Sequence, residues 1–344
     1  MKRIIFFPLA LALCCVVGCN DQEAKAPKPG SPVEVTVAIK GVAGQTKATD
    51  VVFNGSASEA KVNSLQVFVF NGDDREAYRR VTESSTLVPA TSGDRTVWAV
   101  VNAPSLEGIM SMSALKAATS SLSDNSLSNF VMTGSVSQEL VDGGTIAVTV
   151  RRLVSRVSIN RVSTALTDYR EHFMVDIKGI YLVNVPANGS YDLSAEPTDW
   201  ANKLAHNTTA ADELLYDGFS TPERIYNNHP YVKEHVFYTY PNVLPSAANP
   251  DNFSSPTWST WCPRGTLLVL DVDMLKEDGS LYKSGYYPIA LPAMERNKTY
   301  VVEEVRITRL PGDNPFEPIV VGEARVTITV KDWETGVNLG TIDI

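Results

Sequence analysis

The sequence is poor in the residue types that hold metals, cross-link small folds or bind nucleic acid. It contains 4 Cys and 4 His in 344 residues, which leaves little material for a metal site or a disulfide framework. Lys and Arg number 30 against 39 Asp and Glu, so the formal net charge is −9. Because phosphate binding is driven by clustered Lys and Arg, this balance argues against a nucleic-acid partner. The composition is that of a globular protein, and the length predicts two domains.

Signatures of catalysis are also lacking. No His pair has the spacing of metal ligands, and no Gly-x-Ser-x-Gly motif occurs. Residues 41–47 look like a phosphate-binding loop only vaguely, because the Gly-Lys-Ser/Thr ending is missing, and a flexible loop is favoured. Asp271 and Asp273 alternate along a predicted strand and could form a carboxylate pair, but apolar neighbours on the other side favour a solvated outer face. We expect neither enzyme activity nor a cofactor or metal.

The first residues indicate export. Lys2 and Arg3 precede an apolar run over residues 4–17, which is too short for a membrane-spanning helix and is typical of a signal peptide. The run ends in Val16-Val17-Gly18-Cys19, which resembles the lipobox of bacterial lipoproteins. That resemblance implies that residues 1–18 are removed and that Cys19 carries the lipid that tethers the protein to a membrane. Residues 19–30 contain Pro and no apolar periodicity, and they predict an extended tether.

The remaining chain is a series of short alternating runs separated by turn residues. The first run, residues 33–39, places Val33, Val35, Val37 and Ile39 on one face of a predicted strand. Further strands are predicted at residues 65–70, 96–101, 145–150, 153–159, 177–185, 232–240, 266–272, 287–291, 299–307 and 325–330. A helix is expected over 112–121, where apolar residues recur every three or four positions.

This pattern predicts an all-β protein with one or two short helices. Many short strands bounded by Gly, Asn, Asp and Pro are typical of β-sandwiches, and the length requires two of them. We place the junction near Val150, which gives an N-terminal domain at 31–150 and a C-terminal domain at 151–344.

Several segments, taken in order, resemble a known family. Gln45-Thr46-Lys47-Ala48 follows the first predicted strand. Segment 62–72 contains a second strand, and segment 95–102 is an apolar run that ends in Asn. Segments 295–312 and 330–334 lie near the end of the sequence. Together they resemble the fimbrillins of Bacteroidales, the type V pilins. The resemblance implies two tandem transthyretin-like, Greek-key sandwiches and a structural subunit of a cell-surface fimbrium that serves adhesion.

The resemblance also implies assembly by exchange of strands. A trypsin-like protease would cut between Lys47 and Ala48 and remove residues 31–47, and with them the strand of Val33, Val35, Val37 and Ile39. The uncovered groove would accept the C-terminal strand of another copy or of a related fimbrial subunit. The donor residues would be Val337, Leu339, Ile342 and Ile344, with a bulge at Gly340 between two faces. The alternative is a final strand that pairs within its own domain.

Location and partners follow from the same resemblance. An exported outer-membrane lipoprotein precursor, held by lipid on Cys19, would pass into the surface fimbrium and contact a host or bacterial receptor. Known family members have Arg at the cut, where this sequence has Lys47, so an uncleaved, lipidated anchor subunit is an alternative. A surface glycan-binding lipoprotein with Trp258 and Trp261 as a stacking platform is another.

Overall fold

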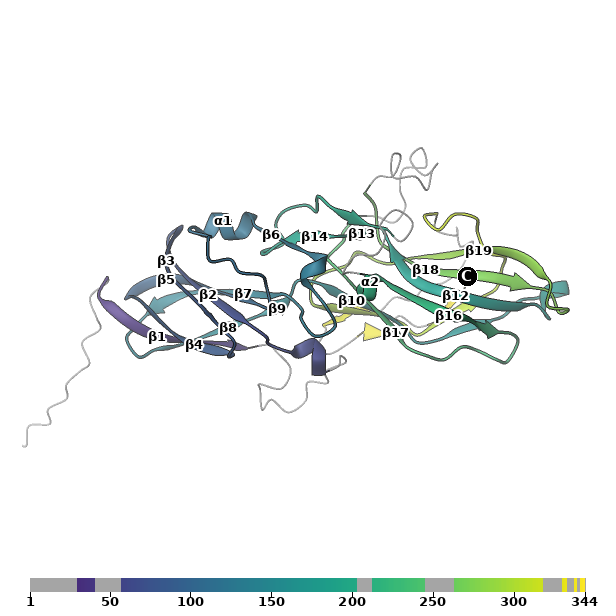
Figure 1. Cartoon of the computed structure of the whole chain (residues 1–344), viewed down its shortest axis with the longest axis horizontal. Coiled ribbons are helices and arrows are strands. Elements are labelled where there is room, and N and C mark those ends of the chain that lie inside the picture. Colours follow the sequence, from purple (N-terminus) through teal and green to yellow (C-terminus); the bar gives the residue numbers. More distant parts are fainter. Residues whose placement is uncertain are drawn as a thin grey trace, which may run out of the picture.

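The computed structural model describes residues 30–40, 57–202, 212–244 and 263–317, with the short strand segments 330–332, 337–338 and 341–343. Strands dominate these ranges, which confirms the predicted all-β class (Figure 1). The molecule is elongated, with β1 at one end and β12, β16, β18 and β19 at the other.

The N-terminal strands form two facing sheets. One contains β3 (Asp74–Val81), β2 (Leu65–Asn71), β5 (Gly93–Val101), β7 (Met132–Leu140) and β9 (Arg151–Arg152), in that order. The other contains β4 (Ser85–Thr91), β1 (Pro32–Lys40) and β8 (Thr145–Thr149). A buried apolar cluster that includes Val35, Val67 and Val148 fills the space between them.

The larger sheet is buried on both faces at β2, where every residue from Leu65 to Phe70 is buried. Successive side chains of a strand point to opposite faces. Leu65, Val67 and Val69 therefore join the cluster under β1, whereas Phe68 and Phe70 join a second cluster that continues into the C-terminal part of the chain. One strand thus connects two cores.

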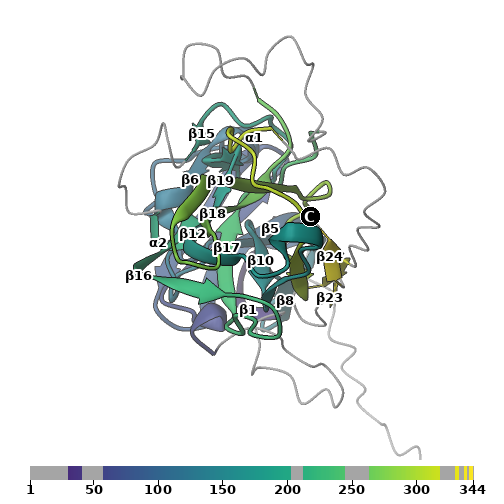
Figure 2. The same ribbon diagram turned by 90° about the vertical axis from the view of Figure 1, so that its right-hand side faces the viewer.

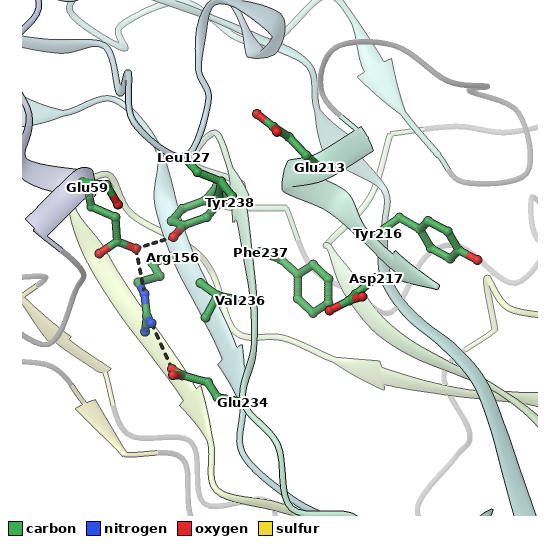
Figure 3. A pocket seen from close by; sticks show the side chains of 11 residues that line it. Glu59, Leu127, Arg156, Glu213, Tyr216, Asp217, Glu234, Val236, Phe237 and Tyr238 are labelled. Carbon is green, nitrogen blue, oxygen red and sulfur yellow. Dashed lines mark hydrogen bonds and ion pairs between the residues drawn. The ribbon is translucent and has the colours of Figure 1, made fainter. Parts of the chain in front are cut away.

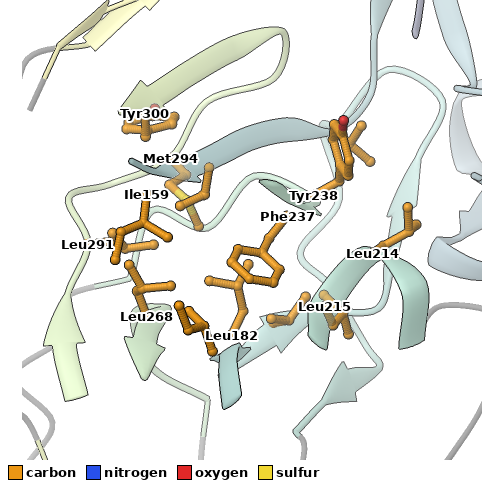
Figure 4. Packing of buried hydrophobic residues seen from close by; sticks show 14 of the residues in the cluster. Ile159, Leu182, Leu214, Leu215, Phe237, Tyr238, Leu268, Leu291, Met294 and Tyr300 are labelled. Carbon is orange, nitrogen blue, oxygen red and sulfur yellow. The ribbon is translucent and has the colours of Figure 1, made fainter. Parts of the chain in front are cut away.

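The C-terminal strands also form several sheets. The strands are β10 (Ser155–Ile159), β11 (Val162–Thr164), β12 (Met174–Val183), β16 (Tyr216–Ile225), β17 (His235–Thr239), β18 (Leu267–Leu275), β19 (Leu281–Ala290), β20 (Lys298–Val302), β21 (Glu304–Ile307), β22 (Val330–Asp332), β23 (Val337–Asn338) and β24 (Thr341–Asp343). Their orders are β17-β10-β20-β22 with β23 also on β20, β11-β21-β24, and β16-β12-β18-β19. Phe237, Leu182 and Leu268 pack together between the sheets, close to Leu215 of α2 (Asp212–Leu215) (Figure 4).

Short elements join the two parts. β6 (Thr119–Ser121) pairs with β14 (Asn188–Ser190), so a loop of the first part is hydrogen-bonded to the second. β13 (Val185–Pro186) pairs with β15 (Trp200–Ala201) nearby. The remaining short helices are η1 (Ala57–Ala60), α1 (Met112–Ala117), η2 (Leu122–Asp124) and η3 (Asp168–Arg170).

The predicted helix over 112–121 is too long. The Ser111 hydroxyl accepts the N–H of Ala114 at 3.1 Å and caps the start of α1, but the helix ends at Ala117. The segment Thr119-Ser120-Ser121 is strand β6. Ser and Thr have low helix propensity, and here their backbone groups pair with β14. Strands β3, β4, β7 and β16 are absent from the sequence prediction, since polar residues occupy many of their half-exposed positions.

A glycine lies where β7 and β8 approach each other closely. A Cβ atom at Gly134 of β7 would lie 2.0 Å from the backbone oxygen of Thr149. We expect Gly134→Ala to lower the free energy of unfolding by about 1–3 kcal/mol or more, because backbone must move to admit the methyl group. Denaturant unfolding measures this. Gly108→Ala, where nothing lies within 4 Å, is the control; equal stability of the two variants would contradict the packing.

Candidate functional site

The first strand occupies the middle of its sheet. β1 pairs antiparallel with β4 from Pro32↔Thr91 to Ala38↔Ser85, and parallel with β8 from Thr36↔Thr145 to Lys40↔Thr149. Among the described residues, β4 and β8 pair with no other strand. β1 therefore supplies the only strand-to-strand pairing that the structure shows for either neighbour.

Backbone hydrogen bonds beyond these ladders fix both ends of β1. At the start, the N–H of Gly30 donates to the oxygen of Ser92 at 2.9 Å, and the N–H of Ser92 donates to Ser31 at 2.8 Å. At the end, the N–H of Val150 donates to the oxygen of Lys40 at 2.9 Å. The strand is thus held over its whole length.

The apolar face of β1 is fully enclosed. Val35 and Val37 are 0% exposed, and Val33 and Ile39 are 3% exposed. They belong to the same cluster as Leu65, Val67, Val69, Val97 and Val148. At about 1.5–3 kcal/mol for each buried side chain, this face contributes roughly 6–12 kcal/mol gross. The alternation read from the sequence therefore identifies the residues that face the core.

The last two strands, β23 and β24, lie at sheet edges in the described part of the chain. β23 pairs parallel with β20 at Tyr300↔Val337, and β24 pairs parallel with β21 at Val305↔Ile342. Figure 2 shows both strands at one side of the body. Val337 and Ile342 thus stand in strands that pair within their own chain, while Leu339 and Ile344 lie outside the described residues. Each strand pairs with a single neighbour, so its release would break one ladder.

A buried charged network ties η1 to the sheet that contains β10 and β17. Glu59 of η1 is 3% exposed, and its carboxylate lies 3.3 Å from Nε of Arg156 on β10 and accepts the hydroxyl of Tyr238 on β17 (Figure 3). Arg156 also contacts Glu234 at 2.9 Å. These side chains line one wall of a cavity of about 650 Å³.

The electrostatics of this network favour a charged Arg156. Burial opposes the charged form, but the carboxylate of Glu59, together with Tyr238 and Glu234, raises the pKa of Arg156. Burial and the negative charge of Glu59 raise the pKa of the Tyr238 hydroxyl. Tyr238 therefore stays protonated and is the donor of the hydrogen bond to Glu59. Sequence reasoning missed this network, because Glu59 and Arg156 are 97 positions apart and no local pattern connects them.

The candidate catalytic carboxylates form a structural ion pair. Asp271 and Asp273 both lie on the partly exposed face of β18, with Lys178 Nζ at 3.0 Å and 2.9 Å from their oxygens. Burial opposes ionisation of Asp273, but hydrogen bonds from Lys178 and Ser284 lower its pKa. One lysine between two carboxylates neutralises charge on a sheet surface and needs no catalytic explanation.

Other candidate residues lie outside the described residues. They are Cys19, Lys47, Ala48, Trp258 and Trp261. In the ranges that the structure describes, no helix is long and apolar enough to cross a membrane. The same ranges hold no group of three or more His, Cys, Asp or Glu side chains arranged for a metal ion.

Comparison with known proteins identifies the class. Residues 32–169 match the family described as major fimbrial subunit protein (FimA). The chain is 21% identical to the major fimbrium subunit FimA type-3 of Porphyromonas gingivalis over 92% of this chain and 90% of that protein. A second subunit of that organism, type-2, is 26% identical over 36% of this chain and 32% of its own length.

Solved structures share the fold. A fimbrilin of Porphyromonas gingivalis superposes with a TM-score of 0.56 at 15% identity, covering 92% of this chain and 98% of its own. A structure described as a cell adhesion protein of Bacteroides eggerthii gives 0.62 at 17% identity, covering 91% and 99%.

The resemblance to the Bacteroidales fimbrillins is therefore confirmed. Residues 32–169 match the fimbrial subunit family, and the described chain has the fold of the fimbrillin structures. These comparisons support a structural fimbrial subunit.

The buried network generates a stability prediction. Glu59→Gln leaves the Arg156 charge buried without its enclosed partner, so we expect a loss of about 3–5 kcal/mol in the free energy of unfolding. Glu234→Gln is the matched control, because the Glu234 side chain is 53% exposed and its loss should cost under about 1 kcal/mol. Denaturant unfolding of both variants tests this; losses of equal size would show that Glu59 is not the essential partner.

Proposed function

We propose that this chain is a structural subunit of a cell-surface fimbrium that serves adhesion and is assembled by strand exchange. The observation that carries the proposal is the position of β1 between two strands that share no ladder with any other described strand. A removable strand must leave a groove that another strand can fill. Such a groove has a strand edge on each side, with backbone groups free to pair, and an apolar floor. Both are present under β1.

Proteolysis between Lys47 and Ala48 is the proposed trigger. The cut would release Val33, Val35, Val37 and Ile39 with the rest of residues 31–47. The tether of residues 19–30 and the lipid on Cys19 would leave with them. The cut would also leave the backbone N–H and C=O groups of β4 and β8 that face β1 without partners. Unpaired backbone groups in a buried position cost free energy. The cleaved subunit would therefore favour a replacement strand strongly.

The proposed donor is the end of another copy or of a related subunit. Val337, Leu339, Ile342 and Ile344 supply apolar side chains, and the described pieces of this segment pair with single neighbours. Leaving such a position breaks few bonds, whereas insertion into the groove forms ladders on two sides. The difference favours transfer from its own domain to the next subunit.

The second candidate function is an anchor subunit. Lys47 stands where known family members have Arg, so an Arg-specific protease would leave the chain uncut and the lipid on Cys19 in place. Such a subunit would remain in the outer membrane at the base of the fimbrium. The choice between the two functions depends on cleavage.

Limited digestion with trypsin tests the trigger. We expect the exported chain from Asn20 onward to be cut predominantly after Lys47, and the product to form ladders that resist mild denaturation. Intact mass gives the cut and native size gives the polymer. Lys47→Ala is the control and should stay uncut and monomeric. A wild-type chain that resists cleavage would favour the anchor, and cleavage without polymer growth would overturn strand exchange.

Removal of residues 337–344 tests the donor. The truncated chain keeps its groove, so after cleavage it should accept a strand but offer none. Mixed with an equal amount of cleaved full-length chain, it should shorten the ladders markedly; alone, it should form none. Ladders of unaltered length from the truncated chain alone would contradict the donor assignment, and unfolding is monitored separately by circular dichroism.

A further inference from the structure

A second cavity lies on the face of the larger N-terminal sheet that points away from β1. Its volume is about 500 Å³, and its walls come from β5, β7, β8, α1 and the segments around Tyr191 and Arg296. Trp98 of β5 belongs to the second core cluster, whereas its neighbours Val97 and Ala99 face β1. The cavity therefore lies on the opposite face of the larger sheet from the apolar floor of the proposed groove, although Thr149 on its wall belongs to β8, which flanks that groove.

A largely buried guanidinium in this cavity has only neutral partners. Arg296 donates through Nε to the oxygen of Arg152 at 3.1 Å, and through Nη2 to the oxygens of Thr133 and Arg151 and to the Thr133 hydroxyl. Nη1 has no acceptor within the described ranges, and no carboxylate there forms an ion pair with this side chain. Burial and the like charge of Arg151 lower the pKa of Arg296 to about 10. The negative charge of Asp192 acts in the opposite direction and compensates the Arg296 charge only in part.

The surroundings add positive charge. Lys116 and Arg151 also line the cavity, and neither has an ion-pair partner among the described residues. The single lining carboxylate, Asp192, accepts hydrogen bonds from the hydroxyls of Ser190 and Ser194 and interacts electrostatically with Lys116, so three cations face one carboxylate. The cavity therefore concentrates cations on a chain whose formal net charge is −9.

One buried donor in the cavity wall is unused. Trp98 is 6% exposed, and its Nε1–H has no hydrogen-bond acceptor among the described residues. Buried polar groups are normally hydrogen-bonded, and an exception indicates a missing partner. The indole N–H and the cations require the same kind of atom, an anionic or strongly accepting oxygen.

We propose that this cavity binds an anionic sugar. The carboxylate of a uronic acid or a related acidic monosaccharide would meet the cations of Arg296, Arg151 and Lys116, and an oxygen of the ligand would accept the indole N–H. The exposed hydroxyls of Ser135 and Thr149 and the carboxylate of Asp192 suit the ring hydroxyls. This site goes beyond strand exchange and does not depend on it.

Titration of the uncut chain with glucuronate tests the site. In a ¹⁵N-labelled sample from Asn20 onward, the Trp98 indole N–H signal, assigned through Trp98→Phe, should shift on adding glucuronate. Neutral glucose should leave it in place, and acetate should bind at least tenfold more weakly. Absence of a shift with glucuronate would overturn the proposal, as would acetate binding as tight as glucuronate, which would show a site for a simple anion only.

A pair of variants checks the charge. Arg296→Ala is unsuitable because the side chain also supports three backbone oxygens, so the exposed Arg151 is changed instead. Arg151→Glu should weaken glucuronate binding about tenfold or more, in line with the loss of a hydrogen bond between charged groups. Arg79→Glu on the exposed side of β3 carries the same charge change and should leave affinity unaltered. Equal weakening by both variants would indicate a diffuse charge effect and contradict a defined site.

Discussion

The sheet of β4, β1 and β8 depends on the backbone pairing of β1 with two strands that share no ladder with each other. Among the described residues, β4 and β8 are joined only through β1, whose apolar side chains complete the core beneath. A strand at the edge of a sheet can be lost with modest damage, but a strand in this position cannot. If β1 were removed as proposed, the same geometry would leave a groove that fits a strand.

The larger sheet, which contains β2, β5 and β7, lies between two buried cores. Its inner face holds the residues that pack on β1, and its outer face joins the core that extends into the C-terminal part. Removal of β1 would therefore open one core and leave the other closed. The Glu59–Arg156 pair adds a polar tie across the junction, close in sequence to the segment that contains the proposed cut.

How far the sequence predicts this structure depends on how strongly each strand alternates. The runs at 33–39, 65–70, 96–101 and 266–272 are apolar enough on one face or both to be recognised, and all are strands. β7 is missed because its exposed residues are polar, and β4 is missed because only Val88 and Ala90 are buried and Pro89, which disfavours a strand, stands between them. The helix over 112–121 is overextended, because its last residues satisfy their backbone in a distant strand.

By itself the sequence determined which side chains share a face and which local segments are extended, because strand periodicity is a local property. It also carried the order of segments that resembles the fimbrillins. Only the tertiary structure decided that β1 lies between residues 85–91 and 145–149, that Lys178 joins Asp271 to Asp273, and that Arg296 lies among neutral oxygens. Backbone amides and charged side chains accept many partners, so the choice among them is made by the packing of distant segments.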